Sequence, residues 1–167
     1  MRGWAVCALT LAVAAVIAAP AVARDSLGVY AAWGAFRDAS PHRCFAIAQP
    51  LRAGGASGWR PFASVATWPD QGVRNQVHIR LSRSRDPRAR VTLSVGDRRF
   101  DLVAGDADAW APDKRTDAAI VAAIRASRSM SVETVSKGGT PFADVYPLSG
   151  AATAIDAAGL GCISRAG

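Results

Sequence analysis

The chain has 167 residues, of which 50% are hydrophobic and 20% are charged, and its formal net charge is +7 at pH 7. This length fits one domain with a core of its own, and the sequence carries no internal repeat or low-complexity segment. After residue 23 no segment is apolar over the ~20 residues that a membrane-spanning helix needs, so no transmembrane segment is expected there.

The first 23 residues have the three parts of a bacterial signal peptide. Arg2 provides the positive start, residues 4–19 carry no charge, and the three residues up to Ala23 read Ala-Val-Ala, a typical cleavage site. A retained membrane anchor is the alternative, although the apolar stretch is shorter than the ~20 residues that span a bilayer. We expect cleavage between Ala23 and Arg24, export to the periplasm or beyond, and a single mature domain of residues 24–167.

The positive charge restricts the expected partners. An exported basic protein does not normally meet nucleic acid, so its partners are expected to be an anionic envelope lipid, an acidic glycan or an acidic protein. A solvated surface that keeps the protein soluble is the alternative interpretation of the same charge. Nothing in the sequence predicts a cofactor.

Two of the three cysteines, Cys44 and Cys162, lie in the expected mature chain. An even number of cysteines in an oxidising compartment favours a disulfide, which would tie the first third of the mature chain to its last turn. Two free thiols or a redox pair are the alternatives, but redox pairs are usually close in sequence, as in C-x-x-C. We therefore predict a structural disulfide.

Short apolar and aromatic segments in the first half of the mature chain are typical of strands. We expect strands at residues 29–36, 43–48 and 62–68, with a Gly- and Ser-rich loop at 51–60. The third strand is followed by a turn signal, Pro-Asp-Gln-Gly, at residues 69–72.

The clearest pattern is the strict alternation of apolar and polar residues between 75 and 103, which predicts strands with one buried and one wet face. The apolar positions are Val77, Ile79, Leu81, Val91, Leu93, Val95, Phe100 and Leu102. Gly96-Asp97 suits a two-residue hairpin turn. We expect a three-stranded antiparallel meander with a loop at 83–89.

Helical spacing replaces the alternation at residues 117–126, where Asp113 or Thr116 could cap the helix. Strands are expected again at 129–135 and 142–148, on either side of a Gly-Gly turn.

An Ala-rich segment at 151–158 predicts a second short helix, which Gly159 and Gly161 are expected to end. Strands outnumber helices about seven to two, and the helices do not alternate with strands as they do in βαβ units. The expected fold is mainly β, an antiparallel β-sandwich or curled sheet with two short helices late in the chain.

The densest charge in the chain is a group of seven arginines, five around an expected hairpin tip and two on the next strand. They are Arg80, Arg83, Arg85, Arg88, Arg90, Arg98 and Arg99. Guanidinium groups pair with phosphates and carboxylates, so contact with an anionic partner is one interpretation. The other is a solvated edge that resists strand pairing with other molecules.

Residue combinations for catalysis lack a supporting local motif. His42 with Cys44 could form a dyad, and His78 could join a Ser-His-Asp set, but no signature such as G-x-S-x-G accompanies either. Cys44 is expected in the disulfide, and His78 falls on the expected wet face. Since Glu133 is the only glutamate, a glycosidase pair would need an aspartate. No catalytic residue is predicted.

Three carboxylates, Asp106, Asp108 and Asp113, surround Trp110 in the segment GDADAWAPD. Oxygen ligands of this kind bind Ca²⁺, but the EF-hand pattern fails, and helix capping also favours aspartate here. No metal site is predicted. Four tryptophans follow residue 23, namely Trp33, Trp59, Trp68 and Trp110. Each is either a core anchor or a platform on which a sugar ring stacks. Trp59 is the best candidate for exposure.

The order of these segments resembles the invasion-associated locus B family over roughly residues 29–162. The resemblance rests on YAAWGAF, RCFAIAQ, VHIRLS, VTLSVGDRRFDL, DAAIVAAIRASRSMSVETV and VYPLSGAATAIDAAGLGC, in that order. It implies a small exported β-rich protein of the bacterial envelope, and it carries over no activity, cofactor or catalytic residue. Where many family members have additional cysteines before the first helix, this chain has DADAWAPD, so one bridge is absent.

Three hypotheses follow from these observations. The first is a non-enzymatic envelope protein that acts by binding, with the segment from Arg80 to Arg99 as its contact surface. The second is a periplasmic enzyme that acts on glycan or peptidoglycan through scattered aspartates, which requires a cleft of converging carboxylates. The third is a structural or inhibitor-like envelope module.

Overall fold

The computed structural model describes residues 24–53 and 58–163. The predicted signal peptide therefore lies outside the described residues. Among the helices of the described part, none is long and apolar enough to cross a membrane.

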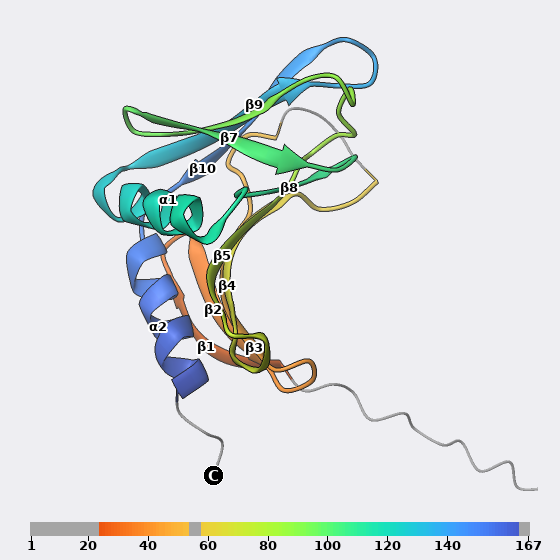
Figure 1. The fold of residues 1–167 in the computed structure, drawn as a ribbon. Helices are drawn as coiled ribbons and strands as arrows, with labels where there is room; N and C mark the ends of the chain where they lie inside the picture. Colours follow the sequence, from red (N-terminus) through yellow and green to blue (C-terminus); the bar gives the residue numbers. More distant parts are fainter. Residues whose placement is uncertain (1–23, 54–57, 164–167) are drawn as a thin grey trace, which may run out of the picture.

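One curled antiparallel sheet forms most of the molecule (Figure 1), and its strand order is β1-β2-β3-β4-β5-β8-β7-β6-β9-β10. The strands are β1 (Arg24–Tyr30), β2 (Trp33–Asp38), β3 (Arg43–Ala48), β4 (Phe62–Trp68), β5 (Val73–Arg80), β6 (Val91–Val95), β7 (Arg98–Ala104), β8 (Asp108–Trp110), β9 (Ser129–Val135) and β10 (Pro141–Pro147). A 3₁₀ turn, η1 (Pro69–Gln71), and two helices, α1 (Lys114–Ala126) and α2 (Ala151–Ile163), complete the described fold. The predicted mainly β fold with two late helices is confirmed.

The first predicted strand is two strands. Tyr30 pairs with Trp33 across a two-residue turn, and Ala31 in that turn has a φ of 51°. Two-residue hairpin turns need this left-handed backbone because it matches the twist of the strands. Alanine gave no turn signal, so the expectation of one strand at 29–36 was wrong.

The predicted meander is half correct. β6 and β7 form the expected hairpin at Gly96-Asp97, with Val95 opposite Arg98. β5, however, pairs with β4 and β8 and does not pair with β6. The three-residue strand β8 lies between β5 and β7, and β6 pairs with β9 instead. The chain after β5 is therefore a crossover and not a hairpin.

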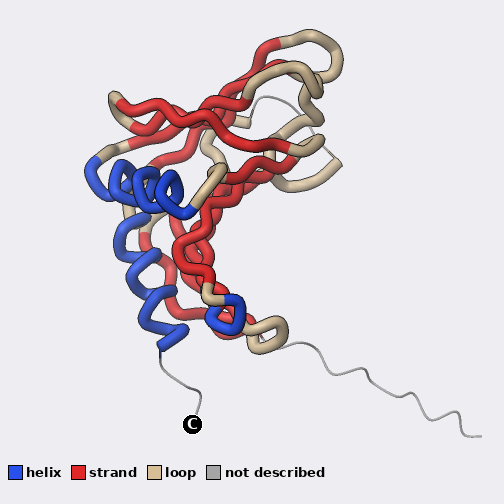
Figure 2. The backbone as a smooth tube through the Cα atoms, viewed as in Figure 1, coloured by secondary structure: helices blue, strands red, loops and turns tan. Residues whose placement is uncertain are grey.

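Both helices pack on one side of the curled sheet (Figure 2), where most of the strands bury apolar side chains. α2 covers β1 to β4, and α1 lies on β5, β6 and β7. Large fully buried side chains between these layers are Trp33, Ile79, Leu81, Leu93, Ile120, Val132 and Tyr146.

The helix ends agree with the sequence at one helix and differ at the other. Asp113 caps α1, since its Oδ1 accepts the Thr116 N–H at 2.7 Å. α2 continues through Gly159 and Gly161 to Ile163, so the predicted end at these glycines was wrong. Position 161 faces the side chain of Leu27 on β1, which would have to shift if the glycine carried a side chain.

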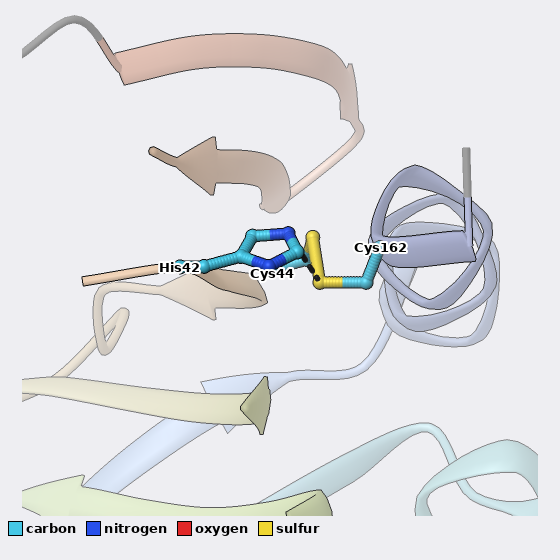
Figure 3. A group of neighbouring side chains, drawn as sticks. All are labelled: His42, Cys44 and Cys162. Atoms are coloured by element: carbon cyan, nitrogen blue, oxygen red, sulfur yellow. Dashed lines mark hydrogen bonds between the residues drawn. A yellow bond between two sulfur atoms is a disulfide. The ribbon is translucent and has the colours of Figure 1, made fainter. Parts of the chain in front are cut away.

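The disulfide between Cys44 on β3 and Cys162 on α2 is confirmed (Figure 3), and it joins residues 118 positions apart. Their Cα atoms are 5.6 Å apart. The bridge fastens the last turn of α2 to the start of β3.

β5 pairs with β8 only from His78 to Arg80. On either side of this short pairing, two backbone N–H groups donate to buried carboxylates instead of to a neighbouring strand. Asp117 of α1 accepts the Val77 N–H at 2.8 Å, and Asp144 of β10 accepts the Ser82 N–H at 2.8 Å. Burial raises the pKa of Asp117. These bonds hold β5 in place, and the outer face of β5 belongs to the candidate site.

Candidate functional site

The sheet face opposite the helices carries several aromatic rings with charged side chains between them. Side chains alternate between the faces of a strand, and the strand register places one series on this side from β2 to β8. We call this surface the open face and define it by Phe36, Phe45, Phe62, Trp68, His78 and Trp110, with Arg24, Asp38, Arg43, Arg80 and Asp108 among them. The solvated face of an antiparallel sheet is commonly polar, so the rings set this face apart.

His78 lies at one end of the open face, inside a network of rings and charges. Its ring stacks on Trp110 at 5.0 Å between centroids and meets the edge of Phe62 at 5.1 Å. Its Nε2 lies 2.8 Å from Asp108 Oδ1, and Arg80 donates to the other carboxylate oxygen at 2.7 Å. His78 is thus fixed by its neighbours and is not the freely exposed histidine that the alternation suggested.

Trp59 extends this end of the face. Its indole N–H donates to the Leu81 carbonyl at 2.8 Å, and the guanidinium of Arg80 lies 5.2 Å from its ring centroid. Trp59 was predicted to be exposed, and its side chain is half-buried because it is held against the end of β5.

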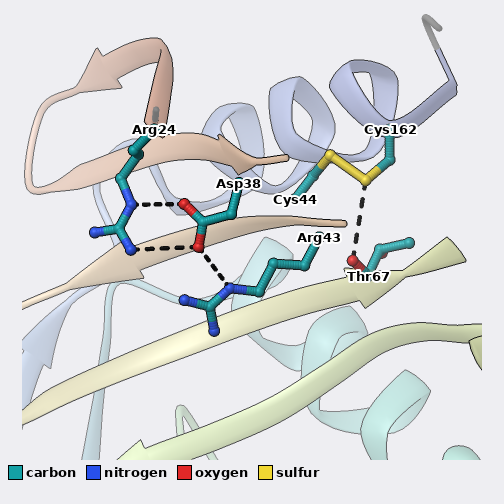
Figure 4. Close-up of polar contacts among 6 residues, drawn as sticks. All are labelled: Arg24, Asp38, Arg43, Cys44, Thr67 and Cys162. Atoms are coloured by element: carbon teal, nitrogen blue, oxygen red, sulfur yellow. Dashed lines mark hydrogen bonds and ion pairs between the residues drawn. A yellow bond between two sulfur atoms is a disulfide. The ribbon is translucent and has the colours of Figure 1, made fainter. Parts of the chain in front are cut away.

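Asp38 organises the other end of the open face between two arginines (Figure 4). Arg24 Nε donates to one carboxylate oxygen at 2.7 Å, and Arg43 Nε donates to the other at 2.8 Å. The Arg43 guanidinium also lies over the rings of Phe45 and Trp68, at 4.5 and 5.2 Å from their centroids. Hydrogen bonds from Arg24 and then Arg43 lower the pKa of Asp38, against the effect of its burial.

Two adjoining hollows lie along the open face. One, of about 270 Å³, lies between the Asp38 cluster and His78 and is lined by Arg43, Phe45 and Trp68. The other, of about 540 Å³, continues towards the β1–β2 turn. Both are lined by Ile47 and Phe62, so the two hollows are neighbours. We call the first hollow, with Arg43, Phe45 and Trp68 in its lining, the groove.

The low pKa of Asp38 makes the Asp38 cluster sensitive to acid. Because the folded pKa lies below the unfolded value, this carboxylate stabilises the fold above about pH 4 and loses that contribution as the pH falls through the folded pKa. We expect Asp38→Asn to lower the free energy of unfolding by about 1–2 kcal/mol at pH 7, with a smaller difference at pH 2. Urea denaturation at both pH values measures this.

Asp25→Asn is the matched control for Asp38→Asn. Asp25 also pairs with an arginine, Arg37, but its side chain is 52% exposed. An exposed pair contributes about 0–1 kcal/mol. Equal losses for the two variants at pH 7 would contradict the special role of Asp38.

The seven predicted contact arginines do not form one hairpin tip, because β5 and β6 are not paired. Arg80 belongs to the open face, whereas the others lie on the crossover after β5 or on the β6–β7 hairpin. Arg85 is structural, since its guanidinium donates to the carbonyls of Ala104, Gly105, Asp86 and Ala89. Arg83 lies 5.9 Å from the ring centroid of Phe142.

Three of the remaining four arginines lie near carboxylates, carbonyls or rings of the protein itself, and the fourth is an exposed strand residue. Arg88 pairs with Asp86 at 3.2 Å and Arg90 with Asp101 at 3.8 Å. Arg98 packs over Phe100 and donates to a carbonyl of α1 at 3.3 Å. Arg99 is exposed on β7. Their contact with an anionic partner stays a prediction.

The three aspartates around Trp110 do not converge. Asp106 pairs with Lys137 at 2.8 Å, Asp108 with His78 and Arg80, and Asp113 caps α1. Within residues 24–53 and 58–163, the group with metal-ligand geometry is a different one, His42 with Cys44 and Cys162. The Cys44 of the suggested dyad is bonded to Cys162, as expected.

Comparisons with protein-family models, curated proteins and solved structures gave no significant match. The open face is therefore interpreted from its own chemistry. Sequence reasoning missed Arg24, Asp38 and Arg43 as site residues. The alternation of Arg43, Phe45 and Ile47 was a usable signal, because it places a charge and two apolar groups on one face.

Proposed function

We propose that this chain is an exported, non-enzymatic binding protein of a bacterial envelope, similar to the invasion-associated locus B family, and that its open face binds an acidic glycan. The observation that carries this proposal is the groove in which arginines lie between aromatic rings, as Arg43 does between Phe45 and Trp68. Such a groove offers apolar ring faces and cationic donors to the same ligand.

The chemistry of an acidic sugar matches both kinds of group. Aromatic faces cover the apolar C–H faces of a sugar ring, and guanidinium forks bind its carboxylates. The aspartates of the open face, Asp38 and Asp108, are held by arginines and by His78, which suits a binding surface better than proton transfer. Export places this surface among the glycans of the envelope.

The test is calorimetric titration of the purified protein with a galacturonic acid hexamer, and with its methyl ester as the uncharged control. We expect binding of the acid and much weaker binding of the ester. Trp68→Ala should weaken binding of the acid about 2- to 12-fold, which corresponds to 0.5–1.5 kcal/mol for one aromatic contact.

A second variant separates the open face from the predicted arginine segment. Arg88→Ser with Arg90→Ser removes two charges outside the groove and should leave the affinity within about twofold at physiological salt, where distant exposed charges are screened. Loss of binding in this variant, with Trp68→Ala unchanged, would move the contact to the arginine segment. Equal binding of acid and ester would reject an acidic ligand.

A further inference from the structure

Three side chains that bind thiophilic metals meet where β3 faces the end of α2 (Figure 3). They are His42, Cys44 and Cys162, and one ligand atom of each lies within 4.8 Å of the others. His42 Nε2 is 4.0 Å from Cys162 Sγ. In the described structure the two sulfurs are bonded to each other, so their metal-binding capacity is latent.

We propose that reduction of the Cys44–Cys162 disulfide converts this cluster into a site for one Zn²⁺ ion, bound by the two thiolates and the imidazole of His42. A dithiol reductant supplies two electrons and two protons, its own thiols become a disulfide, and the S–S bond of the protein gives two thiols. Binding of Zn²⁺ then releases the two thiol protons. Thiolate and imidazole ligands together favour Zn²⁺ over hard cations.

The geometry requires only small movements. Zn–S bonds of about 2.3 Å and Zn–N bonds of about 2.0–2.1 Å place tetrahedral ligand atoms about 3.6–3.8 Å apart. His42 Nε2 is already 4.0 Å from Cys162 Sγ. The two sulfurs must separate by about 1.7 Å once their bond is broken. The ion would therefore keep β3 and α2 joined at the place where the disulfide joins them.

The surroundings support the same assignment. Asp70 Oδ1 lies 3.8 Å from His42 Nδ1. A movement of less than about 1 Å would let this carboxylate accept the Nδ1–H of His42, the contact that orients a metal-binding histidine. Cys44 is fully buried, whereas Cys162 borders an open cavity of about 700 Å³ beside η1 and α2. This cavity admits the reductant and the ion. It also leaves the fourth coordination position to water, as in sites with three protein ligands.

The experiment compares the oxidised and reduced forms of the purified protein under anaerobic conditions. Zn²⁺ binding is measured by competition with a chromophoric chelator, and Cd²⁺ reports thiolate ligation through its charge-transfer absorption. We expect one Zn²⁺ per reduced chain and none per oxidised chain. His42→Ala should weaken Zn²⁺ binding at least about tenfold, and Asp70→Asn by about tenfold.

His78→Ala is the matched control, because His78 is the other histidine of the mature region and contacts Trp110 and Asp108 instead. Its Zn²⁺ affinity should equal that of the unchanged protein. Far-UV circular dichroism of the same samples covers the case in which the reduced chain unfolds, since Zn²⁺ must then restore the folded spectrum. The proposal is overturned if the reduced protein binds no Zn²⁺, or if an unfolded reduced chain does not refold when Zn²⁺ is added. It is also overturned if the His42→Ala variant binds Zn²⁺ as tightly as the unchanged protein.

Discussion

Removal of the Cys44–Cys162 disulfide is expected to lower the free energy of unfolding by about 4–5 kcal/mol. The bridge closes a loop between residues 118 positions apart, and restricting so long a loop removes much conformational entropy from the unfolded chain. Such a loss is a large part of the 5–15 kcal/mol that stabilises a typical domain. Urea denaturation of the protein with and without a metal-free reductant measures it.

The double variant Cys44→Ser with Cys162→Ser separates the bridge from the reductant. It should be as unstable as the reduced protein, and the reductant should not change it further. Hydrogen exchange should show the largest local effect in α2, which the bridge fastens to the sheet. A loss below about 1 kcal/mol would contradict an entropic role for this long-range bridge.

The elements that the sequence predicted well are those whose signal is local. The β6–β7 hairpin was predicted because apolar alternation and the Gly96-Asp97 turn lie within one short segment, and the structure has that pairing. The cap of α1 was one of two candidates, and Asp113 provides it. The disulfide was predicted by number and compartment alone, without any knowledge of distance.

The elements that the sequence missed depend on distant partners. β8 has three residues, too few for an alternating pattern, and it forms a strand because β5 and β7 offer hydrogen-bonding edges on both sides. Asp108 therefore looked like part of an acidic loop when it is a strand residue that faces His78 and Arg80. Because β8 and β7 lie between β5 and β6 in the sheet, the seven arginines predicted around one hairpin tip lie apart.

Most of the candidate site also depends on strand order. The alternation could place Phe45, Trp68 and His78 on one face of their own strands, but not beside one another. That neighbourhood arises only when β3, β4 and β5 pair in the observed register. The Asp38 cluster similarly requires Arg24 and Arg43 to flank Asp38 from the strands on either side of β2.

The second large effect is expected at Trp33. This first residue of β2 is fully buried in the core, and its indole N–H donates to the Pro147 carbonyl at 2.8 Å. Pro147 is the last residue of β10, just before α2, so the contact joins the first hairpin to the end of the fold. We expect Trp33→Ala to lower the free energy of unfolding by about 3–5 kcal/mol, as large core truncations do. Urea denaturation measures this loss.

Two further variants divide the effect of Trp33 into its parts. Trp33→Phe keeps most of the ring but leaves the Pro147 carbonyl without its donor, which should cost about 1–3 kcal/mol. Trp68→Ala removes the same side chain from a half-buried position on the open face, so its cost should be clearly smaller. If Trp68→Ala cost as much as Trp33→Ala, the open face would be part of the folding core, and its rings would be explained without a ligand.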